Sequence, residues 1–406
     1  MNIINKIKSS IAVLIAFVVL LSACNKLYTD PTPLPLPVNS ASNTLAKALA
    51  ASPTDSLFNR LVIRSGILTA APATITDSTL RFTMFVPDNN VMKGFINAIS
   101  GGAVPLAAPD AVFSGFITAN IPVSTAIAIV SYNIIPQSIT TASFPTAFPN
   151  LIYPSIFNPA PTVSSLFRLD VYPSKRSPVN YVNNIPLSSM DAVATNGIIH
   201  HTAAILTPPS LYLWDRINTD TTMKYFKAAV LRADSGSGSP GTLQSALMNI
   251  GANFTVFVPT DSAMRAAITG EITLALIAQG FPPPNAAATA AALASTPAVF
   301  TNPLLYTTLT PRVVSGLVAY HILGTRAFTV NFPTTATLFP TLIMPVTLDP
   351  GVTVQATFAG PIVNAATVKG KGNATASNFK INPFATSDQN YLNGVIHVID
   401  QALFPQ

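Results

Sequence analysis

Two short segments of the chain end at a proline and have the pattern of β-strands. They are Phe82–Pro87 and Phe254–Pro259, and both mix aromatic residues with β-branched ones. Such residues favour strands, and proline ends a strand because it has no N–H to donate. Asp, Asn, Ser and Thr follow the prolines, and these residue types commonly cap helices. We therefore expect one helix to open at Val91 and another at Ala263.

Other patterns predict the elements around these strands. Val130–Ile135 and Val318–Leu323 have apolar residues at helical spacing. The pairs Asn196-Gly197 and Asn393-Gly394 predict tight hairpin turns, to which they would supply the positive φ angles. The apolar run behind each pair is typical of a buried strand.

The same blocks occur twice along the chain, in the same order. The pairs, at separations of 168, 172, 188 and 197 residues, are Phe58–Gly66 with Phe226–Asp234, Phe82–Met92 with Phe254–Met264, Val130–Ile135 with Val318–Leu323, and Thr195–His200 with Leu392–His397. Chance similarity would not preserve this order, so we infer a duplicated domain with longer loops in the second copy. The prolines of Thr207–Ser210 mark the boundary, and a helical segment, Leu211–Arg232, follows them. The predicted domains are residues 41–208 and 209–406, and the alanine-rich segment Asn285–Ser295 of the second predicts a short extra helix.

The N-terminus has the three parts of a secretory signal. Lys6 and Lys8 precede an unbroken apolar run, Ile11–Leu21, and small residues follow it. This run in a helix would reach about 16 Å, well short of a bilayer core of ~30 Å. Leu21–Cys24 reads Leu-Ser-Ala-Cys and resembles the lipobox of bacterial lipoproteins, in which the cysteine is acylated. We expect a signal peptide over residues 1–23 and a lipid on Cys24; the alternative is an ordinary signal peptide with an incidental cysteine.

The chain after the signal carries few charges. Prolines at alternate positions favour an extended tether over residues 24–40. Only 9% of the residues are charged, against about 25% in ordinary proteins, so the net charge of +6 reflects scarcity rather than a basic patch. No cluster of Lys and Arg suits a nucleic acid. Every apolar run after Leu21 is broken within about ten residues, so no membrane-spanning helix is expected there.

The repeated motifs together resemble those of the fasciclin (FAS1) domain. In the second copy these are Phe254–Met264, Tyr320-His321 and Asn393–Pro405; the first copy has Asn133 in place of the histidine. The resemblance implies an α+β fold, with two tandem modules that are each a wedge of mostly antiparallel strands and a helical layer. It also implies adhesion, or contacts with carbohydrate or protein at cell surfaces. The framework residues that it marks are Phe82, Pro87, Asn196, Gly197, His200, Phe254, Pro259, Asp261, Asn393, Gly394 and His397.

The residues that carry catalytic chemistry are few. Glu271 is the only glutamate among fifteen acidic residues, and Cys24 is the only cysteine. Glycoside hydrolysis needs two facing carboxylates, and no spacing here indicates such a pair. His200 and His201 should point to opposite faces of a strand, so they cannot readily share a metal. We expect no catalytic residues, no metal site and no cofactor.

Several aromatic residues are candidates for ligand binding. The Tyr-His pair contacts receptors in some fasciclin relatives, which makes Tyr320 and His321 candidates by resemblance; the competing interpretation is packing. Phe281 lies in the longer loops of the second copy, where recognition often resides. Phe144, Phe148 and Tyr153 stand beside prolines in a region expected to be exposed. They could stack on sugars or another protein, or pack beneath a long connection.

These observations favour an exported, lipid-anchored binding or adhesion protein of the cell envelope, at the outer membrane and facing either the periplasm or the exterior. A carbohydrate-binding accessory lipoprotein of a polysaccharide-uptake system is the alternative. The expected partners are the membrane, through the anchor, and a surface protein or glycan, but no nucleic acid. Asp-Ser and Asp-Thr triplets that begin at Asp55, Asp77, Asp220 and Asp261 resemble O-glycosylation acceptors of Bacteroidetes lipoproteins, although helix capping explains several equally well.

Overall fold

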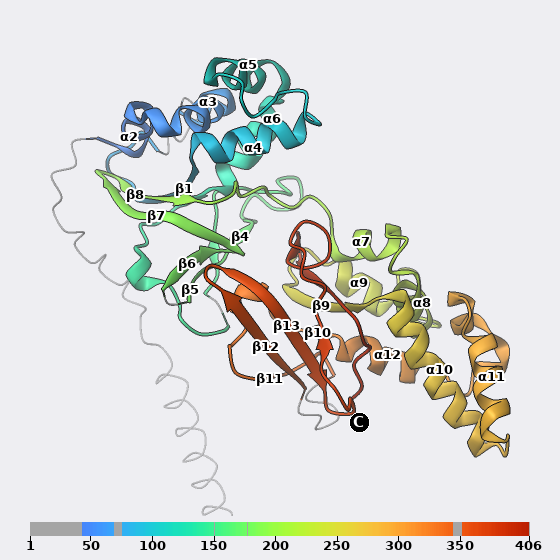
Figure 1. Cartoon of the computed structure of the whole chain (residues 1–406). Helices are drawn as coiled ribbons and strands as arrows, with labels where there is room; N and C mark the ends of the chain where they lie inside the picture. The colour runs from blue at the N-terminus through green and yellow to red at the C-terminus, as the bar shows by residue number, and fades with distance from the viewer. Residues whose placement is uncertain (1–42, 69–74, 150, 177, 344–350, 406) are drawn as a thin grey trace, which may run out of the picture. The chain divides into compact units, whose positions relative to one another are not determined.

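The computed structural model describes residues 43–68, 75–149, 151–176, 178–343 and 351–405 (Figure 1). These residues form one compact unit. The predicted signal peptide (1–23), the tether (24–40) and the lipidation site Cys24 lie outside the described residues. Within the described residues no single helix is long and apolar enough to cross a membrane. One pair of helices, Asp110–Asn120 with Val123–Tyr132, together has the length and composition of a membrane span, but it is bent by 112° at the break between them.

The first half of the unit combines five helices with a mixed sheet in the order β2-β1-β8-β7-β6-β5. The helices are α2 (Leu45–Ala51), α3 (Ser56–Ser65), α4 (Asn89–Ile99), α5 (Asp110–Asn120) and α6 (Val123–Tyr132). The strands are β1 (Phe82–Pro87), β2 (Ile134–Ile135), β5 (Pro173–Arg176), β6 (Val179–Val182), β7 (Ile185–Ala194) and β8 (Gly197–Thr202), and β3 (Tyr153–Pro154) pairs separately with β4 (Asp170–Val171). Short 3₁₀ turns are η1 (Pro53–Asp55) and η2 (Thr141–Ser143).

The second half repeats this plan with the sheet order β10-β9-β16-β15. Its helices are α7 (Leu213–Thr219), α8 (Lys224–Ala233), α9 (Thr242–Met248), α10 (Asp261–Ala278), α11 (Pro283–Leu293) and α12 (Pro311–Tyr320). Its strands are β9 (Phe254–Pro259), β10 (Ile322–Leu323), β15 (Gln389–Tyr391) and β16 (Gly394–Ile399). A second sheet contains β11 (Thr337–Phe339), β12 (Val352–Ala359), β13 (Ile362–Gly370) and β14 (Ser377–Asn378), and the 3₁₀ turns are η3 (Pro297–Thr301), η4 (Pro303–Leu305) and η5 (Thr329–Asn331).

The predicted α+β fold is confirmed, and the bounds of the elements recur at the separations found in the sequence. Helices α2 and α7, and likewise α3 and α8, begin and end 168 residues apart. Strands β1 and β9 lie 172 residues apart, α6 and α12 lie 188 apart, and β8 and β16 lie 197 apart. The short helix predicted at Asn285–Ser295 is also present, as α11.

A parallel pair of strands lies at the centre of each half. Strand β1 pairs with β8 in parallel over six residues, and β9 pairs with β16 in the same way. Every other pairing in these sheets is antiparallel. The expectation of mostly antiparallel strands therefore holds, although periodicity gave no indication that the two most strongly patterned strands would be parallel neighbours.

The helices after β1 and β9 begin two residues earlier than predicted. Asp88 caps α4 and accepts a hydrogen bond from the N–H of Val91 at 2.9 Å. Thr260 caps α10 and accepts from the N–H of Ala263 at 3.2 Å. Val91 and Ala263 are thus the residues whose N–H groups receive the cap, not the first residues of the helices.

The predicted hairpin turns form, but for a different reason than expected. Gly197 and Gly394 do not have the positive φ that we predicted, nor do the asparagines before them. A Cβ at Gly197 would lie 2.1 Å from the carbonyl oxygen of Phe82, so the glycine is needed for close approach to β1.

The predicted helical segment Leu211–Arg232 is two helices, α7 and α8. The break contains Asp220, whose carboxylate accepts from both the N–H and the hydroxyl of Thr222 at 2.7 Å. Such local side-chain bonds compete with helix formation.

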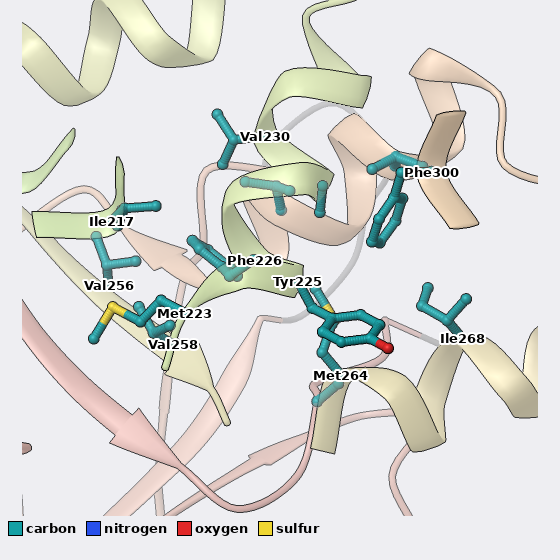
Figure 2. Close-up of a cluster of buried hydrophobic side chains, with 14 of the residues drawn as sticks. Ile217, Met223, Tyr225, Phe226, Val230, Val256, Val258, Met264, Ile268 and Phe300 are labelled. Carbon is teal, nitrogen blue, oxygen red and sulfur yellow. The ribbon is translucent and has the colours of Figure 1, made fainter. Parts of the chain in front are cut away.

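A large apolar core fills the space between the helices and the central strands of the second half. Figure 2 shows Tyr225 and Phe226 of α8 with Met264 and Ile268 of α10 and Val256 of β9. A corresponding cluster in the first half includes Phe58, Met84 and Phe113. The framework that surrounds the strand ends is therefore rigidly packed.

Candidate functional site

The carboxyl ends of the parallel strands β9 and β16 border a pocket of about 800 Å³. We call it the strand-end pocket. Its lining residues are Arg216, Thr219, Asp220, Thr221, Thr222, Met223, Thr260, Asp261, Ser262, Lys380, Ala385, Thr386 and Val398. They come from the end of α7 and the break after it, from the start of α10, from β16, and from the segment between β14 and β15.

Hydrogen bonds already hold the acidic groups of the strand-end pocket. Asp220 forms an ion pair with Arg216 at 2.7 Å. Burial would raise the pKa of Asp220, but the hydrogen bonds from Thr222 and the charge of Arg216 bring this pKa below its ordinary value. Asp261 accepts from the N–H of Tyr225 at 3.0 Å, which joins the start of α10 to the start of α8. Both carboxylates are thus held in place by contacts within the fold.

The cationic groups of the pocket retain free donors. The Nε of Arg216 is buried and has no hydrogen-bond partner within the described residues. Lys380 is exposed, and no described carboxylate lies within ion-pair distance of its ammonium group. Its charge does help to lower the pKa of the nearby Asp400, against the opposing effect of burial and together with hydrogen bonds from Asn378 and Ser377. The pocket can therefore supply the ammonium group of Lys380 to a bound group, whereas the buried Nε of Arg216 is out of reach of a ligand.

The corresponding place in the first half contains an ion pair. Asp55 and His201 stand where the second half has Met223 and Val398, and their contact is 3.1 Å long. The other ring nitrogen of His201 lies 2.8 Å from the hydroxyl of Ser189.

This ion pair shifts the pKa of both partners. The hydrogen bond with Asp55 raises the pKa of His201 above its usual value despite burial, and the charges of Asp55 and Asp88 add to the effect. Burial would raise the pKa of Asp55, but hydrogen bonds from His201, Ser52 and Thr54 lower it overall. Sequence analysis missed this pair because its members lie 146 residues apart.

Tyr320 and His321, which we considered as binding residues, are both completely buried. The Tyr320 hydroxyl donates to the carbonyl of Gly351 at 2.6 Å and accepts from the N–H of Lys371 at 3.0 Å. His321 contacts the carbonyl of Leu317 through Nδ1 at 2.8 Å. The competing interpretation, packing, is therefore the one that the structure favours.

The aromatic residues expected to be exposed in the first half are mostly buried. Phe144 is 3% exposed and Tyr153 is 9% exposed, so the expectation was wrong for both. Phe144 packs edge-on against His200, and the half-buried Phe148 packs edge-on against Phe339. These rings pack beneath the long connection, which was one of the two alternatives. Phe281, by contrast, is 42% exposed after α10 and stays a candidate.

The framework histidines on the final strands are held in a polar network. His397 accepts at Nδ1 from the N–H of Asp388 at 3.2 Å, and its Nε2 lies 2.9 Å from the carbonyl of Ala327. The Asp388 carboxylate in turn accepts from the N–H of Thr329 at 2.6 Å. Burial lowers the pKa of His397 and so favours the neutral imidazole, whose two ring nitrogens both contact backbone groups.

The first half contains the same network with equivalent residues. His200 accepts from the N–H of Asp191 at 3.2 Å and contacts the carbonyl of Ile139 at 2.9 Å, and Asp191 accepts from the N–H of Thr141. Burial lowers the pKa of His200 as well. Sequence analysis did not identify Asp191 or its counterpart, although each stands nine residues before the framework histidine.

The framework asparagines connect each hairpin turn to the first helix of its half. Asn196 accepts from the N–H of Leu45 at 2.8 Å, and Asn393 accepts from the N–H of Leu213 at 3.0 Å. The side chain of Asn393 also donates to the carbonyl of Leu247. The ends of β1 and β9 are buried as well: Phe82, Pro87 and Pro259 are buried, and Phe254 is partly buried.

No family model and no curated protein matches the chain. Among solved structures, the chain is similar to a FAS1 domain pair from the insect cell adhesion molecule Fasciclin I. The similarity covers 86% of this chain and 95% of that chain, with 14% sequence identity and a TM-score of 0.30.

Proposed function

We propose that this protein is an exported, lipid-anchored protein of the bacterial cell envelope. It displays two fasciclin-type modules that bind a surface ligand and carry out no catalysis. The anchor is supported by Leu21–Cys24, which follows a short apolar run with a basic start. The alternating prolines of residues 24–40 would hold the modules away from the membrane.

The observation that carries the binding function is that the polar residues repeated in both halves hold the fold together. In both halves the framework histidine is buried, its pKa is lowered, and both of its ring nitrogens contact backbone groups. Groups held in this way stabilise a scaffold and are unsuited to moving protons. The two halves differ instead at the strand ends, where one contains an ion pair and the other a pocket. A rigid scaffold with one variable surface region suits recognition.

Metabolic labelling tests the anchor. Cells that express the protein are fed an alkyne fatty acid, and the wild type is compared with Cys24→Ser. We expect label only on the wild type and loss of membrane association in the variant. Equal labelling of the two would contradict the proposal. Protease treatment of whole cells then decides whether the modules face the exterior or the periplasm.

An array of glycans and matrix proteins, probed with the purified mature chain, tests the binding function. Saturable binding to a protein supports adhesion, and saturable binding to glycans alone supports the alternative, a carbohydrate-binding accessory lipoprotein of a polysaccharide-uptake system. That alternative is favoured by the hydroxyl-rich lining of the strand-end pocket. A non-catalytic function would be contradicted if the protein turned over a ligand and a single Asp→Asn substitution abolished that turnover.

A further inference from the structure

We infer, on the premise of the binding function proposed above, that the strand-end pocket binds a short saccharide that carries an acidic group. The pocket volume of about 800 Å³ falls in the range of roughly 300–1,000 Å³ that small-molecule sites occupy. An isolated inorganic ion would leave most of this volume unfilled.

The lining of the pocket suits a polyhydroxylated ligand. Six hydroxyl-bearing residues line it, namely Thr219, Thr221, Thr222, Thr260, Ser262 and Thr386. The hydroxyls of Thr219, Thr222 and Thr386 already donate to protein oxygens, so they can accept from the hydroxyls of a sugar. The ion pair of Arg216 and Asp220 adds a fixed donor and a fixed acceptor beside them.

The charges of the pocket select an acidic ligand. Its formal charges sum to zero, but the two carboxylates are already engaged, Asp220 by Arg216 and Asp261 by the N–H of Tyr225. The accessible charge of the lining that has no carboxylate partner among the described residues is cationic, namely the exposed ammonium group of Lys380. A carboxylate or a sulfate on the ligand would accept from this ammonium group, and such charge-assisted bonds are stronger than neutral ones.

An exposed aromatic ring stands beside the lining residues. Phe384 is 94% exposed and directly precedes Ala385 and Thr386. Its segment has a fixed shape, because Asn382 accepts from the N–H of Phe384 through its side chain and from those of Ala385 and Thr386 through its carbonyl. A phenyl ring held in water at this place can stack on the apolar face of a sugar ring.

The first half cannot bind the same ligand at its equivalent place. Asp88 replaces the capping Thr260, and the ion pair of Asp55 with His201 replaces Met223 and Val398. Asp88 adds a carboxylate where the second half has the neutral Thr260, and this charge would repel an acidic sugar. We therefore expect one binding site per chain.

Isothermal titration of the full mature chain with three matched trisaccharides tests the inference. The probes are a uronic acid trimer, a sulfated neutral trimer and the unsubstituted neutral trimer. We expect one site per chain, and binding of at least one acidic trimer that is at least tenfold tighter than binding of the neutral one. The two acidic arms distinguish a carboxylate from a sulfate as the recognised group. A neutral trimer that binds equally well, or no binding of either acidic trimer at millimolar concentration, would overturn the inference.

Two variants and two controls locate the site. Lys380→Ala should weaken binding of the acidic trimer about tenfold, which is ~1.4 kcal/mol, and Phe384→Ala should weaken it at least as much. Both side chains are exposed, so folding should be unaffected. The controls remove another exposed lysine and another exposed apolar side chain, Lys47→Ala and Leu304→Ala, and should leave binding unchanged. Equal effects of variants and controls would place the ligand elsewhere and would leave the anchor and the general binding function intact.

Discussion

Asn133 and His321 occupy equivalent positions in the two halves of the protein, and each bonds to the backbone of an equivalent leucine. His321 follows α12 and accepts at Nε2 from the N–H of Leu403 at 2.9 Å. Asn133 follows α6 and donates to the carbonyl of Leu206 at 2.8 Å. Both side chains are completely buried, and both also contact the carbonyl four residues earlier. Because the Oδ1 of Asn133 has no hydrogen-bond partner within the described residues, the amide is the less complete of the two bridges.

The first prediction concerns the stability of this bridge. His321→Ala should lower the free energy of unfolding by about 2–4 kcal/mol, because the buried N–H of Leu403 then lacks its acceptor. His321→Asn should cost less, about 1 kcal/mol, since an amide oxygen can replace Nε2. Urea unfolding followed by circular dichroism measures both. Equal costs for the two substitutions would show that the volume of the ring matters and the bridge does not.

The same histidine predicts a pH dependence. Burial lowers the pKa of His321 to about 4. Between this value and the ordinary value near 6.5, the unfolded chain binds a proton at this position and the folded chain does not, so stability is lost as pH falls through this window. His321→Asn removes this contribution. The stability advantage of the wild type over His321→Asn should therefore shrink from pH 7 to pH 4; an advantage that stays constant would contradict the prediction.

The ion pair of Asp55 and His201 predicts the opposite behaviour at higher pH. Because the pKa of His201 is raised in the folded state, its contribution to the free energy of unfolding is complete below about pH 6.5. This contribution is lost as the pH rises through the folded-state pKa. The lowered pKa of Asp55 means that its contribution is complete above its usual value near 3.8 and is lost at lower pH. His201→Gln should therefore lower the free energy of unfolding most, by about 1.5–3 kcal/mol, between pH 4 and pH 6.5.

A double substitution provides the control for this pair. Asp55→Met with His201→Val copies the residues of the second half, Met223 and Val398. Replacing a buried ion pair by apolar residues is often neutral, so this variant should be about as stable as the wild type and should lack the pH dependence. A double variant as unstable as His201→Gln would indicate that the surrounding packing, rather than the charge pair, differs between the halves.

Replacing glycine by alanine should have opposite effects on stability in a hairpin turn and in a helix. A Cβ at Gly394 would lie 2.4 Å from the carbonyl oxygen of Phe254, so Gly394→Ala should destabilise the protein by at least about 3 kcal/mol. Gly270 lies within α10, and a Cβ there would meet no atom within 4 Å. Gly270→Ala should raise stability by about 0.5–1 kcal/mol, because alanine loses less entropy in a helix. Thermal unfolding of both variants checks the signs.

The last prediction separates buried from exposed aromatic candidates. Phe144→Ala should cost about 3–5 kcal/mol, because it leaves a cavity in the core. Phe281→Ala should change stability by no more than about 0.5 kcal/mol, because the ring is 42% exposed. Any loss of ligand binding in Phe144→Ala should therefore accompany unfolding. Loss of binding by a fully folded Phe144→Ala would restore this ring as a contact residue.

The accuracy of the sequence analysis depended on how local each feature is. Strands Phe82–Pro87 and Phe254–Pro259 were predicted with their observed bounds, since residue preference and a terminal proline act within a few residues. The starts of α4 and α10 were misplaced by two residues because each cap segment has three consecutive residues of types that cap helices, and the first of the three is the cap. The prediction of positive φ angles at the Asn-Gly pairs was wrong, because the close approach of a neighbouring strand, and not the turn, requires the glycine.

The sequence by itself determined the α+β elements and the duplication, because periodicity, turn residues and the order of motifs are written in consecutive positions. Only the tertiary structure decided which aromatic rings are buried, that β1 and β8 run parallel, and that Asp55 meets His201. It also brought Arg216 and Lys380 to one pocket. Burial and charge pairing of this kind arise from contacts between residues far apart in the chain, and no local pattern records them.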